Sequence, residues 1–171
     1  IAVAAVDATG KPTDATGVQL QGAIDDLCAY DGPLGAEFGL EDKVALRVGA
    51  PTATNVTLVL FDEPRGDETR RVVAMVEDEA SGVWSVTGDD FKGKYYNYEV
   101  TVFNPTTRRV STNVASDPYA RSLAADGRRA HVCDISQDNL KPKGWDTFEK
   151  PKFTHPVDCS IYELHVRDFS A

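Results

Sequence analysis

The hydrophobic and polar positions of residues 34–116 alternate with a period of two, which is typical of β-strands with one buried face. Val44, Leu46 and Val48 lie on one face of the first such strand. Turn sequences rich in Gly, Pro, Asn and Asp separate it from further strand patterns at 56–61, 72–76, 83–87, 95–103 and 110–114. Short strands at intervals of about 10 to 15 residues predict an all-β fold, an antiparallel immunoglobulin-like β-sandwich.

Residues 1–33 are predicted to be a linker followed by a short helix. The first 16 residues are rich in Ala, Thr, Gly and Asp and have no periodicity. Leu20, Ile24 and Leu27 then recur at the spacing of one helix face, and the Asp-Gly-Pro sequence at 31–33 is a helix stop signal.

Residues 117–159 are irregular and charged, and we predict that they form a connector on a surface. At 160–168 the sequence SIYELHVRD returns to strand character. A lone strand presents an unpaired edge, so we expect this segment to lie unpaired in isolation or to pair with another chain.

The most aromatic strand supplies candidate binding residues. Tyr96 and Tyr98 share a face with valines and are predicted to lie in the core. Tyr95 and Asn97 point to the opposite face and follow Lys94. Sugar rings stack on aromatic faces while their hydroxyls take hydrogen bonds. Lys94, Tyr95 and Asn97 are therefore our candidate carbohydrate-binding residues.

The two tryptophans receive different predictions. Trp84 lies in a strand pattern, and we expect it to pack between the sheets. Trp145 lies in the connector, and we expect it to fix the connector against a neighbouring domain.

Charge restricts the class of ligand. The formal net charge is -9 and the sequence pI is about 4.7. Phosphate-bearing partners are bound mainly by Lys and Arg, so the sequence disfavours nucleic acid and anionic membrane surfaces. The longest apolar stretches are strand-length, and we expect no membrane span. A neutral polysaccharide is compatible with this negative charge as a ligand.

The cysteines and histidines do not form a recognisable metal motif. Cys28, Cys133 and Cys159 are widely spaced, which favours free thiols in a reducing compartment. His131 and His155 precede two of them closely, but structural zinc sites usually show two close-spaced ligand pairs. We predict no metal site, and the absence of phosphate-binding or dinucleotide motifs predicts no cofactor.

Carboxylates near the C-terminus are the obvious catalytic candidates. Glycoside hydrolysis needs two carboxyl groups facing each other across the scissile bond. Glu163 and Asp168 are five residues apart, so on a strand they point to opposite faces, and Asp158 lies outside the strand pattern. An ion pair between Asp168 and Arg167 is the simpler interpretation. We assign no catalytic residue.

Several stretches resemble one family, the plant-type limit dextrinases and pullulanases of glycoside hydrolase family 13. They are APTA at 50–53, GVWSV at 82–86, YYNYEV at 95–100, DPYARSL at 117–123 and IYELHVRDFS at 161–170. The first four resemble a module of carbohydrate-binding module family 48 and its exit. The last resembles the first strand of the catalytic (β/α)8 barrel, so the resemblance makes residues 160–171 the start of that barrel.

The resemblance implies an enzyme that hydrolyses α-1,6-glucosidic linkages in limit dextrins and pullulan, located in the plastid stroma. The nucleophile and general acid lie on later barrel strands, so this chain is expected to be a non-catalytic accessory region. Its expected partners are α-glucan and the catalytic barrel. The family usually has Trp before the APT segment, where this chain has Gly49, so weak sugar binding is expected.

Two other functions remain open. One is an independent glucan-binding or regulatory module, like the one in the β subunit of the AMP-activated kinase. The other is a sandwich interaction domain with no role in sugar binding. The segment from residue 160 onward separates these hypotheses, because an independent module has no use for a lone barrel strand.

Overall fold

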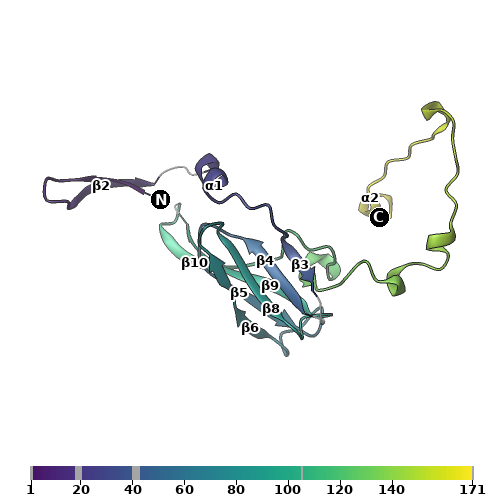
Figure 1. The fold of residues 1–171 in the computed structure, drawn as a ribbon, viewed down its shortest axis with the longest axis horizontal. Helices are drawn as coiled ribbons and strands as arrows, with labels where there is room; N and C mark the ends of the chain where they lie inside the picture. Colours follow the sequence, from purple (N-terminus) through teal and green to yellow (C-terminus); the bar gives the residue numbers. More distant parts are fainter. Residues whose placement is uncertain (1, 18–20, 40–42, 105, 171) are drawn as a thin grey trace. The chain divides into compact units, whose positions relative to one another are not determined.

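The computed structural model describes residues 2–17, 21–39, 43–104 and 106–170. The chain divides into two compact units, Ile1–Ile135 and Ser136–Ala171. The first contains the sandwich, and the second consists of short helical turns joined by extended segments (Figure 1). Each unit is described by itself.

One layer of the sandwich is a five-stranded antiparallel sheet with the order β10-β9-β5-β6. Its strands are β5 (Ala53–Phe61), β6 (Arg71–Ala74), β9 (Tyr95–Asn104), β10 (Arg109–Ala115) and β11 (Ala130–His131). The two-residue strand β11 pairs with the first residues of β9, beyond the point where β10 ends.

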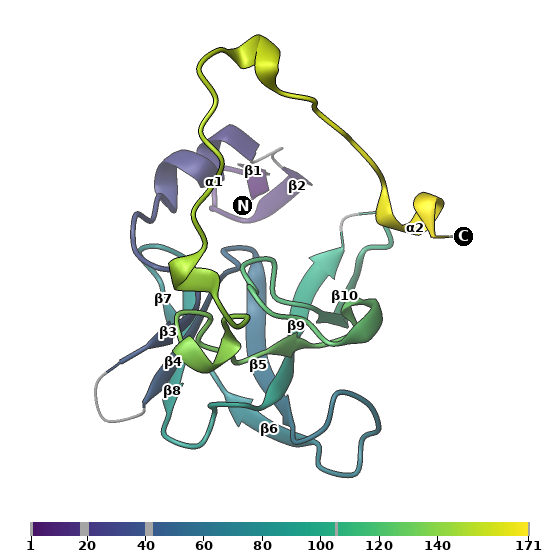
Figure 2. The ribbon, with the colours of Figure 1, turned by 90° about the vertical axis from the view of Figure 1, so that its right-hand side faces the viewer.

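The second layer is a four-stranded antiparallel sheet with the order β3-β4-β8-β7. Its strands are β3 (Gly35–Phe38), β4 (Val44–Gly49), β7 (Val76–Asp78) and β8 (Val83–Gly88). Figure 2 shows this layer beside the layer that contains β5, β9 and β10.

The strand predicted at 72–76 is two strands in two different sheets. β6 pairs with β5 in one layer, and β7 pairs with β8 in the other. Met75 lies between them and is buried. The chain therefore crosses between the layers at this residue, which alternation of hydrophobic positions cannot reveal.

The core lies between the two layers and confirms the predicted sandwich. Val44 and Leu46 from one layer and Leu58 and Leu60 from the other are at most 2% exposed. Each such side chain contributes about 1.5 to 3 kcal/mol of hydrophobic stabilisation. Trp84 is buried in the same cluster, as predicted.

Tyr96 and Tyr98 are buried in the core, as predicted, and their hydroxyl groups meet a buried carboxylate. Tyr96 donates to Asp117 at 2.7 Å and Tyr98 at 3.3 Å. The backbone N–H of Tyr119 donates to the other carboxylate oxygen of Asp117 at 2.8 Å. This cluster fixes the start of the 117–123 segment to the core of the sandwich.

Residues 117–135, which were predicted to be part of the connector, lie in the first compact unit. His131 donates its backbone N–H to the Ser122 carbonyl, and Leu123 forms a bridge with Ala130. Ala130 and Val132 are fully buried. A few small apolar residues among charged ones are too weak a pattern to reveal this packing.

The predicted linker at 1–16 instead forms a β-hairpin of β1 (Ala2–Val6) and β2 (Pro12–Gly17). Asp7 accepts hydrogen bonds from the backbone N–H groups of Thr9 and Lys11, which closes the turn. The predicted short helix is present as α1 (Gln21–Leu27). Its predicted first residues, 18–20, lie outside the described residues.

The second unit contains only short helical elements in its described part. They are η3 (Asp138–Leu140), η4 (Trp145–Thr147), η5 (Pro156–Asp158) and α2 (Val166–Phe169); the first unit adds η2 (Ala125–Gly127). Every described residue from 138 to 170 is exposed. Residues 160–165 form no strand within the described chain and 166–169 form the short helix α2. A parallel barrel strand needs neighbouring strands to pair with, and we expected this segment to lie unpaired in isolation.

Candidate functional site

Lys94 stands at the entrance to strand β9. The preceding turn places Gly93 at φ +77°, and the Lys94 N–H donates to the Phe91 carbonyl at 3.0 Å. Its ammonium group forms an ion pair with Asp62, at the end of β5. The Lys94 side chain is 33% exposed, so it can meet a ligand from solvent.

The ring of Tyr95 is stacked on another ring. The centroids of Tyr95 and His131 are 4.6 Å apart with an interplanar angle of 18°. The Ser122 hydroxyl in turn hydrogen-bonds Nδ1 of His131 at 3.1 Å. One face of Tyr95 is therefore covered, and a sugar could stack only on the other face.

The prediction that Asn97 lies on the surface was wrong. Asn97 is 8% exposed, and its side-chain amide donates to the Arg128 carbonyl at 3.1 Å. The Ser116 hydroxyl reaches its amide oxygen at 3.5 Å. The covering contact comes from Arg128, in a segment that the sequence pattern did not place against this strand.

Sequence analysis missed a group of charged and polar residues beside Lys94. Asp62, Thr69, Arg71 and Asp90 line a recess of about 190 Å³ together with Lys94. Arg71 and Asp90 form an ion pair at 2.8 Å, and the Arg71 hydrogen bond lowers the pKa of Asp90 below its usual value. The four positions lie in turns and at a strand start, and no spacing in the sequence signals that they converge.

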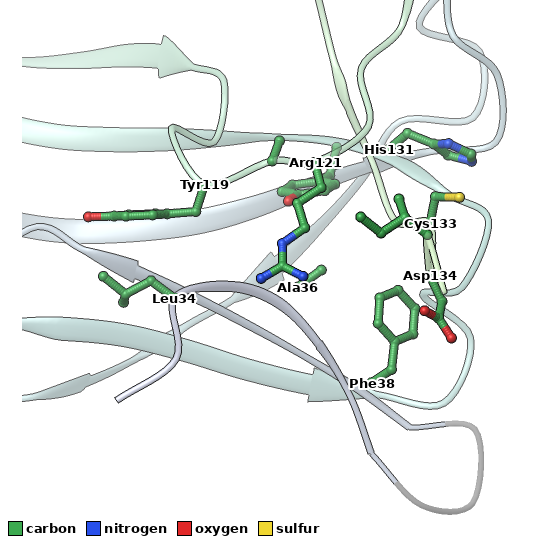
Figure 3. Close-up of a pocket in the computed structure, with 11 residues that line it drawn as sticks. Leu34, Ala36, Phe38, Tyr119, Arg121, His131, Cys133 and Asp134 are labelled. Carbon is green, nitrogen blue, oxygen red and sulfur yellow. The ribbon is translucent and has the colours of Figure 1, made fainter. Parts of the chain in front are cut away.

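A second recess lies where residues 119–135 pack against strand β3 (Figure 3). In Figure 3 the Arg121 side chain points toward β3, where Ala36 lies. The volume of this second recess is about 50 Å³, far below the several hundred Å³ of a typical ligand pocket. This space suits water rather than a sugar.

Gly49 is exposed at the last position of β4 and leaves open space. A Cβ atom built there would meet no atom within 4 Å. Gly49 pairs with Val83 at the start of β8, whereas Lys94 follows the loop that leaves the other end of β8. The Gly49 position and the Lys94 recess thus lie at opposite ends of the sandwich.

The sequence motifs at 50–53 and 82–86 meet in space. The Trp84 indole N–H donates to the Ala50 carbonyl at 3.3 Å, and the Ala50 N–H donates to the Gly82 carbonyl at 3.0 Å. Gly82 has φ +63°, and a Cβ there would lie 2.4 Å from Pro51. The glycine is required by this close approach.

The candidate interface residue Trp145 and the carboxylates considered as catalytic candidates lie in the second unit. Trp145 is 65% exposed. Asp158 accepts a hydrogen bond from the backbone N–H of His155, as part of a turn. Asp168 lies 3.3 Å from Nδ1 of His165, so its partner is this histidine and not Arg167.

Residues 33–120 match the family described as carbohydrate-binding module 48, the isoamylase N-terminal domain. The match begins just before β3 and ends within the segment fixed by Asp117. The chain belongs to the carbohydrate-binding module 48 family. Its immunoglobulin-like sandwich and its two meeting motifs are the module.

Two pullulanases align with the whole chain, including the residues outside the module. Pullulanase 1, chloroplastic, of Arabidopsis thaliana is 45% identical over 174 residues, covering 100% of this chain and 18% of the relative. The pullulanase of Klebsiella pneumoniae is 35% identical, covering 100% of this chain and 16% of the relative. The chain therefore spans less than a fifth of the length of these relatives.

Solved structures agree with the fold. The Klebsiella pneumoniae pullulanase complexed with maltotriose matches 86% of this chain and 14% of its own, with a TM-score of 0.71 and 36% identity. The pullulanase of Bacillus acidopullulyticus matches 84% of this chain and 16% of its own, with a TM-score of 0.66 and 33% identity.

Three further observations concern the described chain as a whole. Within the described ranges, no helix is long and apolar enough to cross a membrane. Cys28, Cys133 and Cys159 are free thiols. Among the residues that the structure describes, no three His, Cys, Asp or Glu side chains gather as metal ligands would.

Proposed function

We propose that this chain is the non-catalytic accessory region of a starch-debranching enzyme that hydrolyses α-1,6-glucosidic linkages in limit dextrins and pullulan. The observation that carries the proposal is the 45% identity to a chloroplastic pullulanase, which extends along the whole chain. A relative that shared only the module would align with residues 33–120 and not beyond.

The second unit is proposed to pack against the catalytic barrel. Its large hydrophobic side chains are exposed, among them Trp145 at 65%, Phe148 at 71% and Phe153 at 63%. Exposed apolar residues at this density are typical of a protein interface. Trp145 then has the role predicted from the sequence, which is to hold the connector against a neighbouring domain.

The module is proposed to contact α-glucan weakly, through the end that carries Lys94 and Tyr95. One face of Tyr95 is covered by His131, and Gly49 offers no aromatic surface at the opposite end. Stacking is therefore limited, and hydrogen bonds to sugar hydroxyls remain. The plastid stroma is the proposed location, since one relative is chloroplastic and free thiols suit a reducing compartment.

Pullulan hydrolysis by the purified chain tests the non-catalytic assignment. We expect no release of reducing ends above buffer, because glycoside hydrolysis needs a carboxylate pair facing one substrate. Sustained hydrolysis would refute the assignment. Micromolar affinity for maltoheptaose by the chain alone would instead favour an independent glucan-binding module.

Reconstitution tests the proposed interface. The chain is mixed with the separately purified catalytic region of a pullulanase that shares this module, and complex formation is followed by sedimentation velocity. We expect binding, and a weakening of about tenfold or more in the double variant Trp145→Ala, Phe148→Ala. The control Val110→Ala alters an exposed side chain of the sandwich instead. Equal binding by both variants would exclude the second unit as the interface.

A further inference from the structure

The recess beside Lys94 contains equal numbers of positive and negative groups. Lys94 pairs with Asp62, and Arg71 pairs with Asp90 at 2.8 Å. All four groups line the same recess, together with Thr69. The local charges cancel, so the recess favours neither an anion nor a metal cation and suits a neutral polar ligand.

The four charged side chains keep much of their hydrogen-bonding capacity. An ammonium has three donors, a guanidinium five, and a carboxylate about four acceptor sites. The contacts seen in the described chain use one atom of each group for its ion pair. The Thr69 hydroxyl accepts the Asp62 backbone N–H at 2.9 Å, and its own proton is free to be donated. Both donors and acceptors therefore line one small space.

Two apolar residues also line the recess but offer no stacking surface. Leu60 and Phe61 line it and are 2% and 5% exposed. The Arg129 guanidinium lies 3.4 Å from the centroid of the Phe61 ring and covers that ring. A ligand in the recess is thus held by polar contacts, which makes binding weak.

The volume of the recess limits the size of the ligand that it can hold. At about 190 Å³ the recess is smaller than the pockets of about 300 to 1,000 Å³ that enclose drug-sized ligands. It can receive one sugar ring edge, but not a glucan chain. The hydroxyl-rich edge of one hexose likewise presents both donors and acceptors.

We infer that the recess formed by Asp62, Thr69, Arg71, Asp90 and Lys94 is a subsite for a single glucose unit of an α-glucan. This inference rests on the proposed function, because it takes the ligand class from a starch-debranching enzyme. Asp62 and Asp90 accept from sugar hydroxyls, and Arg71, Lys94 and Thr69 donate to them. The hydrogen bond from Arg71 lowers the pKa of Asp90, so its carboxylate is ionised at neutral pH and available as an acceptor.

An NMR titration of the 171-residue chain with maltotriose tests this subsite. We expect amide shift changes near residues 60–71 and 89–95 that saturate with a Kd of the order of 1 to 10 mM. Sorbitol, an open-chain polyol, is expected to give no saturating change. Changes centred on Gly49, an equal response to sorbitol, or no saturation by about 50 mM would overturn the inference.

Charge-neutralising variants test whether the charged residues of the recess contact the sugar. Lys94→Met and Asp90→Asn are each expected to raise the Kd about fivefold or more, because each removes a donor or acceptor of the sugar. Glu37→Gln is the matched control. It disrupts the Arg47–Glu37 pair, whose side chains are 27% and 48% exposed, close to the 33% and 52% of Lys94 and Asp62. An equal effect of all three variants would overturn the inference.

Failure of the subsite and failure of the proposed function are distinguishable. Loss of the saturating titration leaves the assignment to a debranching enzyme intact, because that rests on the alignment and on the reconstitution experiment. Hydrolysis of pullulan by the chain alone would refute the non-catalytic assignment, whatever the titration shows.

Discussion

Strand β4 and the segment 161–166 both alternate hydrophobic and polar residues, but they adopt different structures. β4 has Val44, Leu46 and Val48 on its inner face, at most 6% exposed. In the segment 161–166, Ile161 is 91% exposed and Leu164 is 46% exposed. β4 pairs with β3 and β8 and faces an opposing sheet, whereas the described residues of the second unit include no strand that could pair with 161–166.

The difference teaches that alternation predicts the capacity to form a strand and not the strand itself. A strand requires partners for its backbone N–H and C=O groups and a second layer for its apolar face. The sandwich supplies both within one chain. The second unit has the apolar side chains without the second layer, and a separate catalytic domain is the partner proposed for it.

The largest effect is expected from a matched pair of leucine truncations. Leu46→Ala is expected to cost about 2 to 5 kcal/mol of unfolding free energy, because Leu46 is fully buried. Leu164→Ala is expected to change it by less than about 0.5 kcal/mol. Urea denaturation followed by far-UV circular dichroism measures both. A large cost for Leu164→Ala would show that the second unit has a core of its own.

The buried carboxylate provides the next comparison. Asp117→Ala removes the acceptor of the Tyr96 and Tyr98 hydroxyls, and we expect a cost of about 2 to 3 kcal/mol. Asp168→Ala removes an exposed contact with His165, and we expect less than about 0.5 kcal/mol.

Asp117→Asn is the intermediate case and checks the mechanism. The amide oxygen can still accept a hydrogen bond from a tyrosine, so the cost should be smaller than for alanine. If the two Asp117 variants were equally destabilised, the acceptor role would be wrong and the loss would come from packing.

Sequence analysis predicted the sandwich well because its strands alternate strongly. The inner faces of β4 and β9 were assigned correctly, including Tyr96 and Tyr98, and so was the burial of Trp84 in β8. The hairpin at β1 and β2 was missed, since alanine and threonine give no clear period. Extended segments of small residues form a strand pair through backbone hydrogen bonds, which composition does not display.

The candidate site was predictable only in part. Lys94 and Tyr95 were found because they flank an obvious strand. Asn97 was misplaced because its cover comes from residues more than 15 positions later in the chain, where Arg128 supplies the carbonyl. The residues at 62, 69, 71 and 90 meet Lys94 only after β5, β6 and β9 have paired. Convergence of this kind depends on strand register, which a single sequence does not specify.

The smallest effect concerns alkaline pH and again separates the two regions. Burial raises the pKa of Tyr96 and of Tyr98 above its usual value, and the nearby Asp117 carboxylate raises both further. The unfolded chain releases these protons near pH 10, while the folded chain keeps them. Unfolding therefore becomes easier as pH rises above about 10, by roughly 1.4 kcal/mol per pH unit for each tyrosine.

Urea midpoints between about pH 8 and 11 measure this slope. Tyr98→Phe is expected to reduce the slope by roughly 1.4 kcal/mol per pH unit, since one buried proton no longer contributes. Tyr162→Phe in the second unit is the control, because Tyr162 is 78% exposed and its surroundings in the folded chain resemble those in the unfolded chain. An unchanged slope in Tyr98→Phe would mean that the alkaline loss of stability arises outside the buried tyrosine cluster, and the contrast between the two regions would then rest on hydrophobic burial alone.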